Sequence, residues 1–480
     1  MFQTVTLPLW LFVLILVFAG VTFASHFLFP SVRWFFRRRM EKVVARLNQR
    51  LDQPIQPFKL MRRHDMIIRL VHDPKVAEAV AAEAQETGEP QSVVFERARR
   101  YAREIVPAFS ASVYFGFAAR IAKWIGRKLY RVRIGHFEAE AIGAIDRGAT
   151  IVFVMNHRSN MDYMLVTHLA SRRSALSYAV GEWARVWPLS WLIRSSGAYF
   201  IRRKSGNPLY RRVLSRYVQM ATEEGVAQAI FPEGGLSLDG RVGAARLGIL
   251  SYIVSGYRPG GRDVVFIPVA LNYDRVLEDR VLVAAQLAGK RRFRAPLGKV
   301  ISVGARHLWQ MLRGRFRQFG TAAVSFGTPL SLASFLADAG PDPTGELATA
   351  LMKRITQNVP VLPVPLTAAA LREGEAADLD ALVARAEVLA GRLNAAGAHL
   401  NLPQGSVRAA VEIGVAQLIE RQMAMQQAAR IIPAPDQMAI MEFYAAPTLQ
   451  LLDAVAASAP EKIAPKSPDR RSKRHKITKQ

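Results

Sequence analysis

The stretch Thr-Ile-Val-Phe-Val-Met-Asn-His-Arg-Ser-Asn-Met-Asp-Tyr, residues 150–163, decides how the middle of this chain folds. Its first six residues, Thr150–Met155, form an apolar run of the length that a buried strand has. From Met161 the pattern becomes that of a helix, which we expect to continue to Ala170. A strand, a short loop and a helix in this order are the unit from which α/β proteins are built.

His157 and Asp162 lie on this predicted loop and at its end. An imidazole titrates near neutral pH, and a neighbouring carboxylate fixes its tautomer and stabilises the imidazolium. Such a pair can activate a hydroxyl nucleophile without a covalent enzyme intermediate. As the first residue of a helix, Asp162 could equally serve as a cap, and so could Ser159.

Strand and helix patterns alternate between residues 135 and 335, which predicts an α/β domain with a largely parallel sheet flanked by helices. His157 and Glu233 each follow a strand directly, so we expect both at the same edge of the sheet. The predicted strands are Thr150–Met155, Ala175–Val180, Ala198–Ile201, Ala227–Phe231, Val264–Leu271 and Ala322–Phe326. The predicted helices are Met161–Ala170, Trp187–Ser195, Pro208–Glu224 and Ala244–Ser255.

Helical patterns flank this domain on both sides, at residues 33–134 and 336–460. Basic and apolar residues interleave over Ala118–Val132, which suits a helix at a membrane interface or one packed on the next domain. The helices predicted after the domain are Glu346–Asn358, Asp378–Ala395 and Val407–Gln427. Residues 461–480 are basic and rich in Pro, Ser and Lys, so we expect a disordered tail.

Residues 1–32 contain no Asp, Glu, Lys or Arg, and Thr6–Phe29 is long enough to cross a bilayer as a helix, which takes about 20 residues. Arg and Lys residues follow at once between Arg33 and Lys42, and such charges favour the cytoplasmic side. We therefore expect a transmembrane anchor in the inner (cytoplasmic) membrane, with the catalytic domain facing the cytoplasm. A cleaved signal peptide is disfavoured because no charged residue precedes the apolar run.

The 480 residues carry a formal net charge of +27, with an isoelectric point near 10.8, and include no Cys. The absence of Cys excludes disulfides and thiolate nucleophiles, and no metal-ligand spacing appears. The charge indicates a polyanionic partner, which could be nucleic acid, an anionic membrane surface or an acidic small substrate. No nucleic-acid module is recognisable, so membrane lipids and acidic substrates are the expected partners.

Three further segments follow the first in a fixed order: Gly197–Arg203, Phe231–Ser237 and Val265–Val269. The series resembles the four blocks of the glycerolipid acyltransferase superfamily. The segments His-Arg-Ser-Asn-Met-Asp-Tyr and Gly-Ala-Tyr-Phe-Ile-Arg-Arg are most similar to those of one branch of the superfamily, the bacterial membrane glycerol-3-phosphate acyltransferases. Residues 358–400 and 431–452 also resemble the C-terminal part of that enzyme.

The resemblance implies a role for each block. His157 would be the general base and Asp162 its helper, while Arg203 would bind the phosphate of the acceptor. Adjacent residues on a strand face opposite ways, so only one of Arg202 and Arg203 should face the site unless the strand has already ended before them. Glu233 would help to place the acceptor, although it could instead pair with a nearby Arg. The predicted substrate-binding residues are Ser159, Gly197, Arg202, Arg203, Glu233, Gly234, Ser237 and Pro268.

One position departs from the pattern of the branch, which usually has Glu-Gly-x-Arg-Ser in the third block. This chain has Leu236 where that Arg belongs. Either Arg241 or Arg246 replaces the missing phosphate ligand, or the acceptor differs. We expect Pro268 in the fourth block to end the regular hydrogen bonding of its strand and to shape the pocket.

The expected activity is transfer of a fatty acyl group to the sn-1 hydroxyl of glycerol 3-phosphate, which makes lysophosphatidic acid. The acyl donor would be a thioester of coenzyme A or of acyl carrier protein, and no further cofactor is expected. The alternative within the superfamily is acylation of lysophosphatidate or another lysophospholipid. A non-catalytic membrane-binding protein is the alternative outside it, and the intact His157–Asp162 pair disfavours it.

Overall fold

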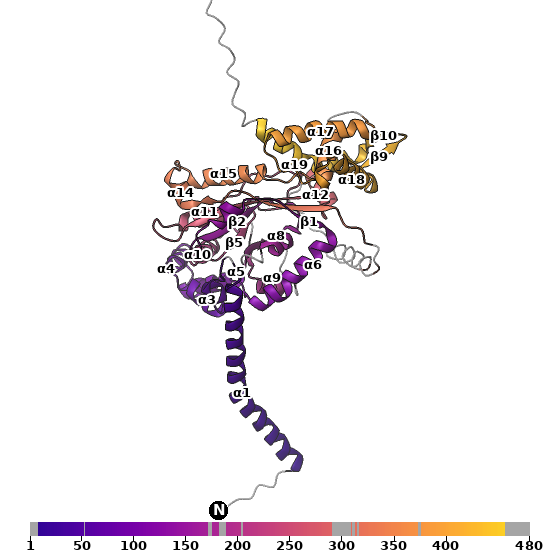
Figure 1. The fold of residues 1–480 in the computed structure, drawn as a ribbon. Coiled ribbons are helices and arrows are strands. Elements are labelled where there is room, and N and C mark those ends of the chain that lie inside the picture. The colour runs from indigo at the N-terminus through magenta and orange to yellow at the C-terminus, as the bar shows by residue number, and fades with distance from the viewer. Residues whose placement is uncertain are drawn as a thin grey trace, which may run out of the picture.

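A mostly parallel sheet lies at the centre of the molecule (Figure 1). The computed structural model describes residues 8–456 except 52, 171–174, 182–188, 203–204, 290–308, 310–312, 314–315 and 373–375, with the backbone alone at 23–37, 40, 170, 455 and 456. Within these residues the strand order is β1-β7-β6-β2-β5-β3-β4, and β8 pairs with β6. The strands are β1 Arg131–Phe137, β2 Thr150–Met155, β3 Ser177–Gly181, β4 Tyr199–Ile201, β5 Gln228–Ile230, β6 Val264–Tyr273, β7 Thr321–Phe326 and β8 Leu330–Ser331.

Strand β2 lies in the middle of the sheet, parallel to both of its neighbours, β6 and β5. All six of its residues are buried, as expected of a strand covered on both faces. β3 and β4 continue the parallel order, whereas β7 and β8 run antiparallel to β6. The predicted α/β architecture with a largely parallel sheet is therefore confirmed.

The ends of the elements differ from the predictions in a few places. The bounds predicted for β2 are those observed, and the other predicted strands are present with ends displaced by one or two residues. Helix α6 (Ala119–Leu129) ends earlier than predicted. The prediction was wrong at Val132, which lies in β1 and pairs with Ala322 of β7. Pairing with a distant strand overrides the local helical pattern there.

Helices cover both faces of the sheet (Figure 1). The face shown downward carries α4, α5, α8 and α10, and the opposite face carries α14 and α15 together with the C-terminal helices. Helix α10 begins at Pro208 because Asn207 caps it, accepting a hydrogen bond from the N–H of Tyr210 at 2.7 Å. The helices of the domain are α7 Ala139–Gly143, α8 Asp162–Ala170, α9 Leu189–Ser195, α10 Pro208–Glu223, α11 Gly248–Gly256, α12 Asp279–Leu287, α14 Leu332–Ala337 and α15 Pro343–Gln357.

The N-terminal region is helical, and its first helix projects from the body of the molecule (Figure 1). Within the described part of the chain, none of the helices is both long enough and apolar enough to cross a membrane. The predicted anchor lies partly outside that part, because residues 1–7 and the side chains of residues 23–32 are not described. The helices here are α1 Leu9–Asn48, α2 Pro57–Leu60, α3 Arg63–Val71, α4 Pro74–Thr87, α5 Gln91–Ile105, the π-helix η1 Ser112–Ala118, and α6.

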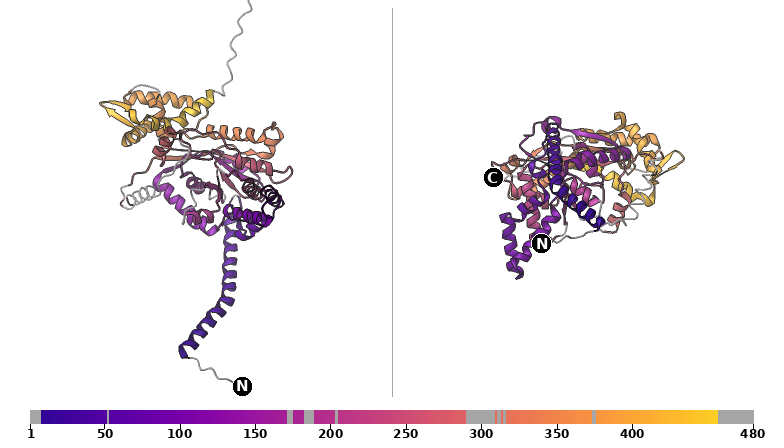
Figure 2. Two further views of the ribbon diagram at one scale, coloured as in Figure 1. Left: turned by 180° about the vertical axis from the view of Figure 1, so that it is seen from behind. Right: turned by 90° about the horizontal axis from the view of Figure 1, so that it is seen from below.

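The C-terminal region packs on the sheet domain at the end opposite to α1 (Figure 2). Helix α18 ends at Glu420, so the prediction of a helix to Gln427 was wrong. Residues 424–427 instead form β9, which pairs with β10 in a two-stranded sheet. The predicted tail, residues 461–480, lies outside the described residues. The elements are α16 Pro363–Arg372, α17 Leu379–Ala395, α18 Val407–Glu420, β9 Ala424–Gln427, β10 Arg430–Pro433 and α19 Met438–Ala456, with short 3-10 turns at Pro403–Gly405 and Pro435–Gln437.

Candidate active site

The loop between β2 and α8 brings His157 and Asp162 together. The imidazole Nδ1 lies 2.9 Å from Oδ2 of Asp162, and both side chains are almost fully enclosed. When Nδ1–H donates to this carboxylate, the other ring nitrogen, Nε2, carries the lone pair. The predicted pair is therefore present, with the geometry that general-base chemistry needs.

Asp162 holds the loop as well as the imidazole. Its Oδ2 accepts hydrogen bonds from the backbone N–H groups of Arg158 (2.7 Å) and Ser159 (3.1 Å). Its Oδ1 accepts one from the hydroxyl of Tyr273, the last residue of β6. The backbone donors precede Asp162 in the chain, so the carboxylate closes its own loop rather than capping α8.

The ring of His157 packs against two aromatic side chains. The ring centroid of Phe231 lies 4.2 Å away and that of Tyr163 lies 5.5 Å away. Only 3% of His157 is exposed to solvent. A base in such an apolar setting is shielded from bulk water, so a hydroxyl bound beside it would not compete with solvent for the lone pair.

Glu233 lies at the same sheet edge as His157, as predicted for two residues that follow parallel strands. Its Oε1 accepts the backbone N–H of His157 at 2.9 Å, and its Oε2 accepts that of Gly243 at 3.2 Å. Burial raises the pKa of Glu233 to about 7, against the opposing effect of these two donors. The carboxylate thus joins the third block directly to the backbone of the loop between β2 and α8.

Ser159 and Ser237 make hydrogen bonds inside the protein. The hydroxyl of Ser159 donates to Glu278 at 2.9 Å and accepts the N–H of Met161 at 3.2 Å. The hydroxyl of Ser237 donates to the carbonyl oxygen of Arg241 at 2.7 Å. The N–H of Ser237 donates to the carbonyl oxygen of His157 at 2.8 Å. In the described structure both serines order the loops around His157.

Gly197 and Gly234 occupy positions where a side chain would not fit. Gly197 has φ of +87°, and a Cβ there would lie 2.9 Å from the ring of Phe109 and 3.0 Å from Cε of Lys59. Gly234 has φ of +70°, and a Cβ there would lie 2.8 Å from Cδ of Arg246. Both glycines therefore have a steric reason to be present.

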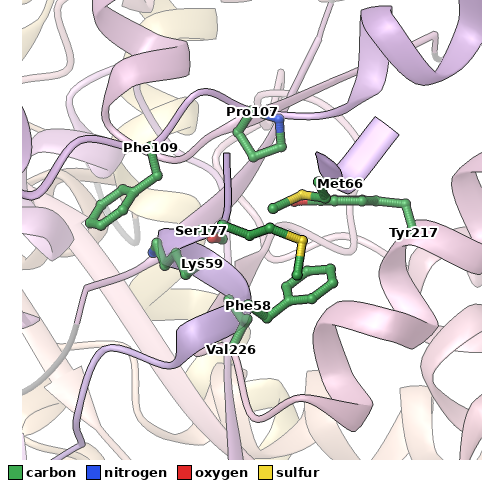
Figure 3. Close-up of a pocket in the computed structure, with 9 residues that line it drawn as sticks. Phe58, Lys59, Met66, Pro107, Phe109, Ser177, Tyr217 and Val226 are labelled. Atoms are coloured by element: carbon green, nitrogen blue, oxygen red, sulfur yellow. The ribbon is translucent and has the colours of Figure 1, made fainter. Parts of the chain in front are cut away.

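Near Gly197 there is a small cavity of about 10 Å³, room for roughly one water molecule. Figure 3 shows Lys59, Phe109 and Ser177 around it. The ammonium nitrogen of Lys59 donates to the carbonyl oxygen of Ala175 at 2.6 Å, and burial lowers the pKa of Lys59 well below its usual range. His157 does not line this cavity, so the cavity is separate from the candidate active site.

Pro268 lies within β6 and does not end it, so that prediction was wrong. It pairs with Val154 of β2, and the strand continues to Tyr273. Its carbonyl oxygen accepts the N–H of Gly327 at 2.9 Å. Within a strand, the N–H and C=O of one residue point toward the same neighbouring strand. The N–H that Pro268 lacks would therefore point toward the edge of β6 at which its neighbour changes from β8 to β7. The ladder therefore loses no bond there.

The arginine pair of the second block is only half described, because Arg203 lies outside the described residues. Both nitrogens of the Arg202 guanidinium fork donate to the carboxylate of Glu104, at 2.8 and 2.6 Å. The guanidinium also lies 5.2 Å from the ring centroids of Tyr101 and Tyr210. Its described contacts join β4 to helices α5 and α10.

The two arginines considered as replacements at the third block differ in their contacts. Arg241 is exposed and lies 3.4 Å from the carboxylate of Asp453 in α19. The side chain of Arg246 lies along Gly234, and its N–H donates to the carbonyl oxygen of Pro232 at 2.7 Å. Leu236 itself is partly buried and packs against the core. Of the two side chains, that of Arg246 is thus the one that lies beside the third block.

Three residues of the site are not evident from the sequence alone. Tyr273 donates to Asp162, Glu278 accepts from Ser159, and the side chain of Arg158, on the loop between β2 and α8, is fully buried. Tyr273 and Glu278 lie more than 110 positions from their partners, a separation at which no local pattern carries information. Arg158 lies next to His157, yet its burial depends on contacts with α19.

Residues 136–272 match the acyltransferase family, and residues 307–474 match the family described as the glycerol-3-phosphate acyltransferase C-terminal region. Together the two stretches cover more than half of the chain.

Curated relatives named glycerol-3-phosphate acyltransferase are similar to most of the chain. The one from Pseudomonas entomophila is 27% identical over 416 residues, which cover 81% of this chain and 49% of the relative. The one from Ectopseudomonas mendocina is 29% identical over 375 residues, covering 73% and 44%. The chain thus spans about half the length of the curated relatives it matches. A crystal structure of 1-acyl-sn-glycerophosphate (LPA) acyltransferase from Thermotoga maritima matches with a TM-score of 0.31 and 19% identity, over 51% of this chain and 76% of that one.

Proposed function

Because the chain belongs to the glycerolipid acyltransferase superfamily, we propose that it transfers a fatty acyl group from an acyl thioester to the sn-1 hydroxyl of glycerol 3-phosphate. The observation that carries the proposal is the buried His157–Asp162 pair at the carboxyl end of β2. The C-terminal family match and the names of the curated relatives favour this acceptor among those of the superfamily.

The proposed reaction uses Nε2 of His157 as the base. This nitrogen takes the proton of the sn-1 hydroxyl while the oxygen attacks the thioester carbonyl carbon. A carbon–oxygen bond forms, the tetrahedral intermediate collapses, and the carbon–sulfur bond breaks. The imidazolium returns the proton to the leaving thiolate, and Asp162 stabilises its positive charge in between. The products are lysophosphatidic acid and a free thiol on coenzyme A or acyl carrier protein.

Acyl transfer by the purified protein to a panel of acceptors tests this function. Glycerol 3-phosphate, lysophosphatidate, another lysophospholipid and unphosphorylated glycerol would each be offered with a long-chain acyl-CoA and with acyl carrier protein. We expect glycerol 3-phosphate to be preferred. A preference for lysophosphatidate would establish the alternative acceptor, for which Leu236 is the motivation. No transfer to any acceptor, with either donor, would refute the proposal.

We propose that Arg203 holds the phosphate of the acceptor, since Arg202 is engaged by Glu104. Arg203→Ala should raise the KM for glycerol 3-phosphate by roughly ten- to a hundredfold, because a charge-assisted contact contributes about 1.5–3 kcal/mol. The KM for the acyl thioester should change little. Arg203→Lys should restore only part of the loss, because an ammonium cannot make the planar two-point contact.

Arg202→Ala is the matched control for this test, because it removes a neighbouring guanidinium that the structure assigns to Glu104. Each substrate is varied separately in all three variants. If Arg202→Ala raises the acceptor KM more than Arg203→Ala does, the phosphate ligand is Arg202. Equal effects of Arg203→Ala on both substrates would mean that Arg203 supports the fold.

We also propose that the protein is held at the inner membrane by its first helix and by a second surface. Exposed aromatic residues gather on consecutive or contacting helices: Phe117 on η1, Trp124 on α6 and Trp191 on α9. Four basic residues of α6 lie among them: Arg120, Lys123, Arg127 and Lys128. Helices α6 and α9 lie on the side of the sheet from which α1 projects (Figure 1). Aromatic and basic side chains together suit an anionic bilayer surface.

Removal of residues 1–32 should weaken membrane attachment without abolishing it. The truncated protein should sediment with membranes at low salt and be released at high salt, because the remaining attraction is largely electrostatic. The full-length protein should stay bound in both. The measurement is fractionation over a salt series. Release of the full-length protein by salt would exclude a spanning segment, and a truncated protein that is free at low salt would exclude the second surface.

A further inference from the structure

The catalytic loop is held on two sides by segments that helix α19 contacts. On one side is the loop after the third block, residues 237–242, which binds the carbonyl oxygen of His157 through the N–H of Ser237 at 2.8 Å. On the other side is Glu278, at the start of α12. Both segments contact α19 within the described structure.

On the first side, α19 binds the backbone of the 237–242 loop. The side-chain amide of Gln450 accepts the N–H of Val242 at 2.8 Å and donates to its carbonyl oxygen at 2.9 Å. Gly240 lies so close to α19 that a Cβ there would be 2.0 Å from the carbonyl oxygen of Phe443. The loop cannot move independently of the helix without breaking this pair of hydrogen bonds.

Arg158 extends from the catalytic loop into the same contact. Its Nη1 donates to the carbonyl oxygen of Gly240, and its guanidinium lies 4.7 Å from the centroid of the Phe443 ring. The residue is 1% exposed, and Nε and Nη2 have no hydrogen-bond partner among the described residues. Burial of a cation with one hydrogen-bond partner is costly, and burial lowers the pKa of Arg158 against the opposing effect of nearby groups such as Tyr444 and Asp162. Burial of an apolar residue at this position would cost less free energy, so the presence of an arginine indicates a role besides stability.

On the second side, the contact runs through the first turn of α12. Glu278 accepts the hydroxyl of Ser159 and the side-chain amide of Asn160, each at 2.9 Å. The next residue, Asp279, accepts the hydroxyl of Tyr444 in α19 at 2.5 Å, and the same hydroxyl accepts the N–H of Val276 at 2.9 Å. Arg421, the residue that follows α18, also pairs with Asp279.

We propose that α19 positions the loop that carries His157, with Arg158 and Tyr444 as the positioning residues on its two sides. The C-terminal region is then a working part of the active site, because it sets where the imidazole lies relative to a bound hydroxyl. The proposal rests on the proposed acyl transfer for its kinetic effect. Small displacements of a catalytic group have large effects on rate, and about 1 Å can cost a hundredfold.

The principal test is Tyr444→Phe, which removes one hydroxyl and keeps the ring in the core. We expect kcat to fall roughly ten- to a hundredfold while the KM for each substrate changes little. Glu442→Ala is the matched control, since Glu442 is exposed, lies two residues away in the same helix and contacts Arg372 at 3.9 Å. It should behave as the wild type does. A normal kcat in Tyr444→Phe would overturn the proposal for that side of the loop.

Arg158→Met and Arg158→Lys test the other side. Met keeps the length and apolar stem, removes the buried charge and should fold at least as stably as the wild type. A fall in kcat without a fall in the unfolding midpoint identifies positioning, which Lys should restore in part. If the unfolding midpoint falls together with kcat in Arg158→Met and Tyr444→Phe alike, these residues support the fold only, and the proposal is overturned.

Hydrogen–deuterium exchange of the 153–165 segment makes the test independent of the acceptor. The amides of this segment should exchange faster in Tyr444→Phe and Arg158→Met than in the wild type and Glu442→Ala. Faster exchange in a protein that transfers no acyl group would leave the positioning intact and refute only the proposed function. Unchanged exchange together with unchanged kcat would refute the positioning and leave the function standing.

Discussion

His157→Ala should abolish acyl transfer while the protein stays folded. Loss of a general base typically costs about 10²–10⁴-fold in rate. Here Nδ1 is held by Asp162, so removal of the ring removes the lone pair of Nε2, the nitrogen proposed as the base. The fold should survive because two contacts of residue 157 are made by its backbone and do not depend on the side chain. These are the N–H to Glu233 and the carbonyl oxygen to Ser237.

The measurement is single-turnover acyl transfer to glycerol 3-phosphate, with the unfolding midpoint as the check on the fold. His168→Ala is the matched control, because His168 lies on the following helix, α8, outside the catalytic loop. It should retain nearly the full rate. A His157→Ala protein that turns over like the wild type would show that another group is the base.

Asp162→Asn should lower kcat by about 10²–10⁴-fold and leave the loop closed. The amide oxygen can take the place of Oδ2, where it still accepts from Nδ1 of His157 and from the two backbone N–H groups. The amide nitrogen then faces the hydroxyl of Tyr273, which can turn to accept it. The tautomer is therefore kept and the negative charge is lost, so the imidazolium is no longer stabilised.

Tyr273→Phe separates charge from hydrogen bonding in the same cluster. It removes one donor to Asp162 and leaves the carboxylate ionised. Its effect on kcat should be about tenfold, the low end of what the loss of one hydrogen bond to a charged group produces. If Asp162→Asn were no slower than Tyr273→Phe, the carboxylate would serve only to close the loop. Comparable unfolding midpoints in the two variants are needed for the comparison.

The parts of the site that the sequence predicts are those encoded within a few residues of one another. The strand Thr150–Met155 and the loop to Asp162 form one local unit, so the apolar run and the His-to-Asp spacing are sufficient to place both catalytic groups. The alignment of Glu233 with His157 also follows, because carboxyl ends of neighbouring parallel strands share an edge.

The parts that the sequence does not predict depend on contacts between distant segments. The residues after Glu420 have good helical propensity, yet they pair with β10 after Gln422 takes a left-handed φ of +58°. Pro268 has the local signature of a strand end, but its missing N–H falls where no partner is required. In both cases the partner strand decides the outcome.

The order in which the active site is completed follows from the contact between Gln450 and Val242. These residues are 208 positions apart, and Gln450 lies in the last helix that the structure describes. During synthesis the loop that carries His157 leaves the ribosome long before α19, the helix that holds this loop, has been made. A nascent chain therefore carries His157 and Asp162 through most of its elongation before the α19 contacts can form.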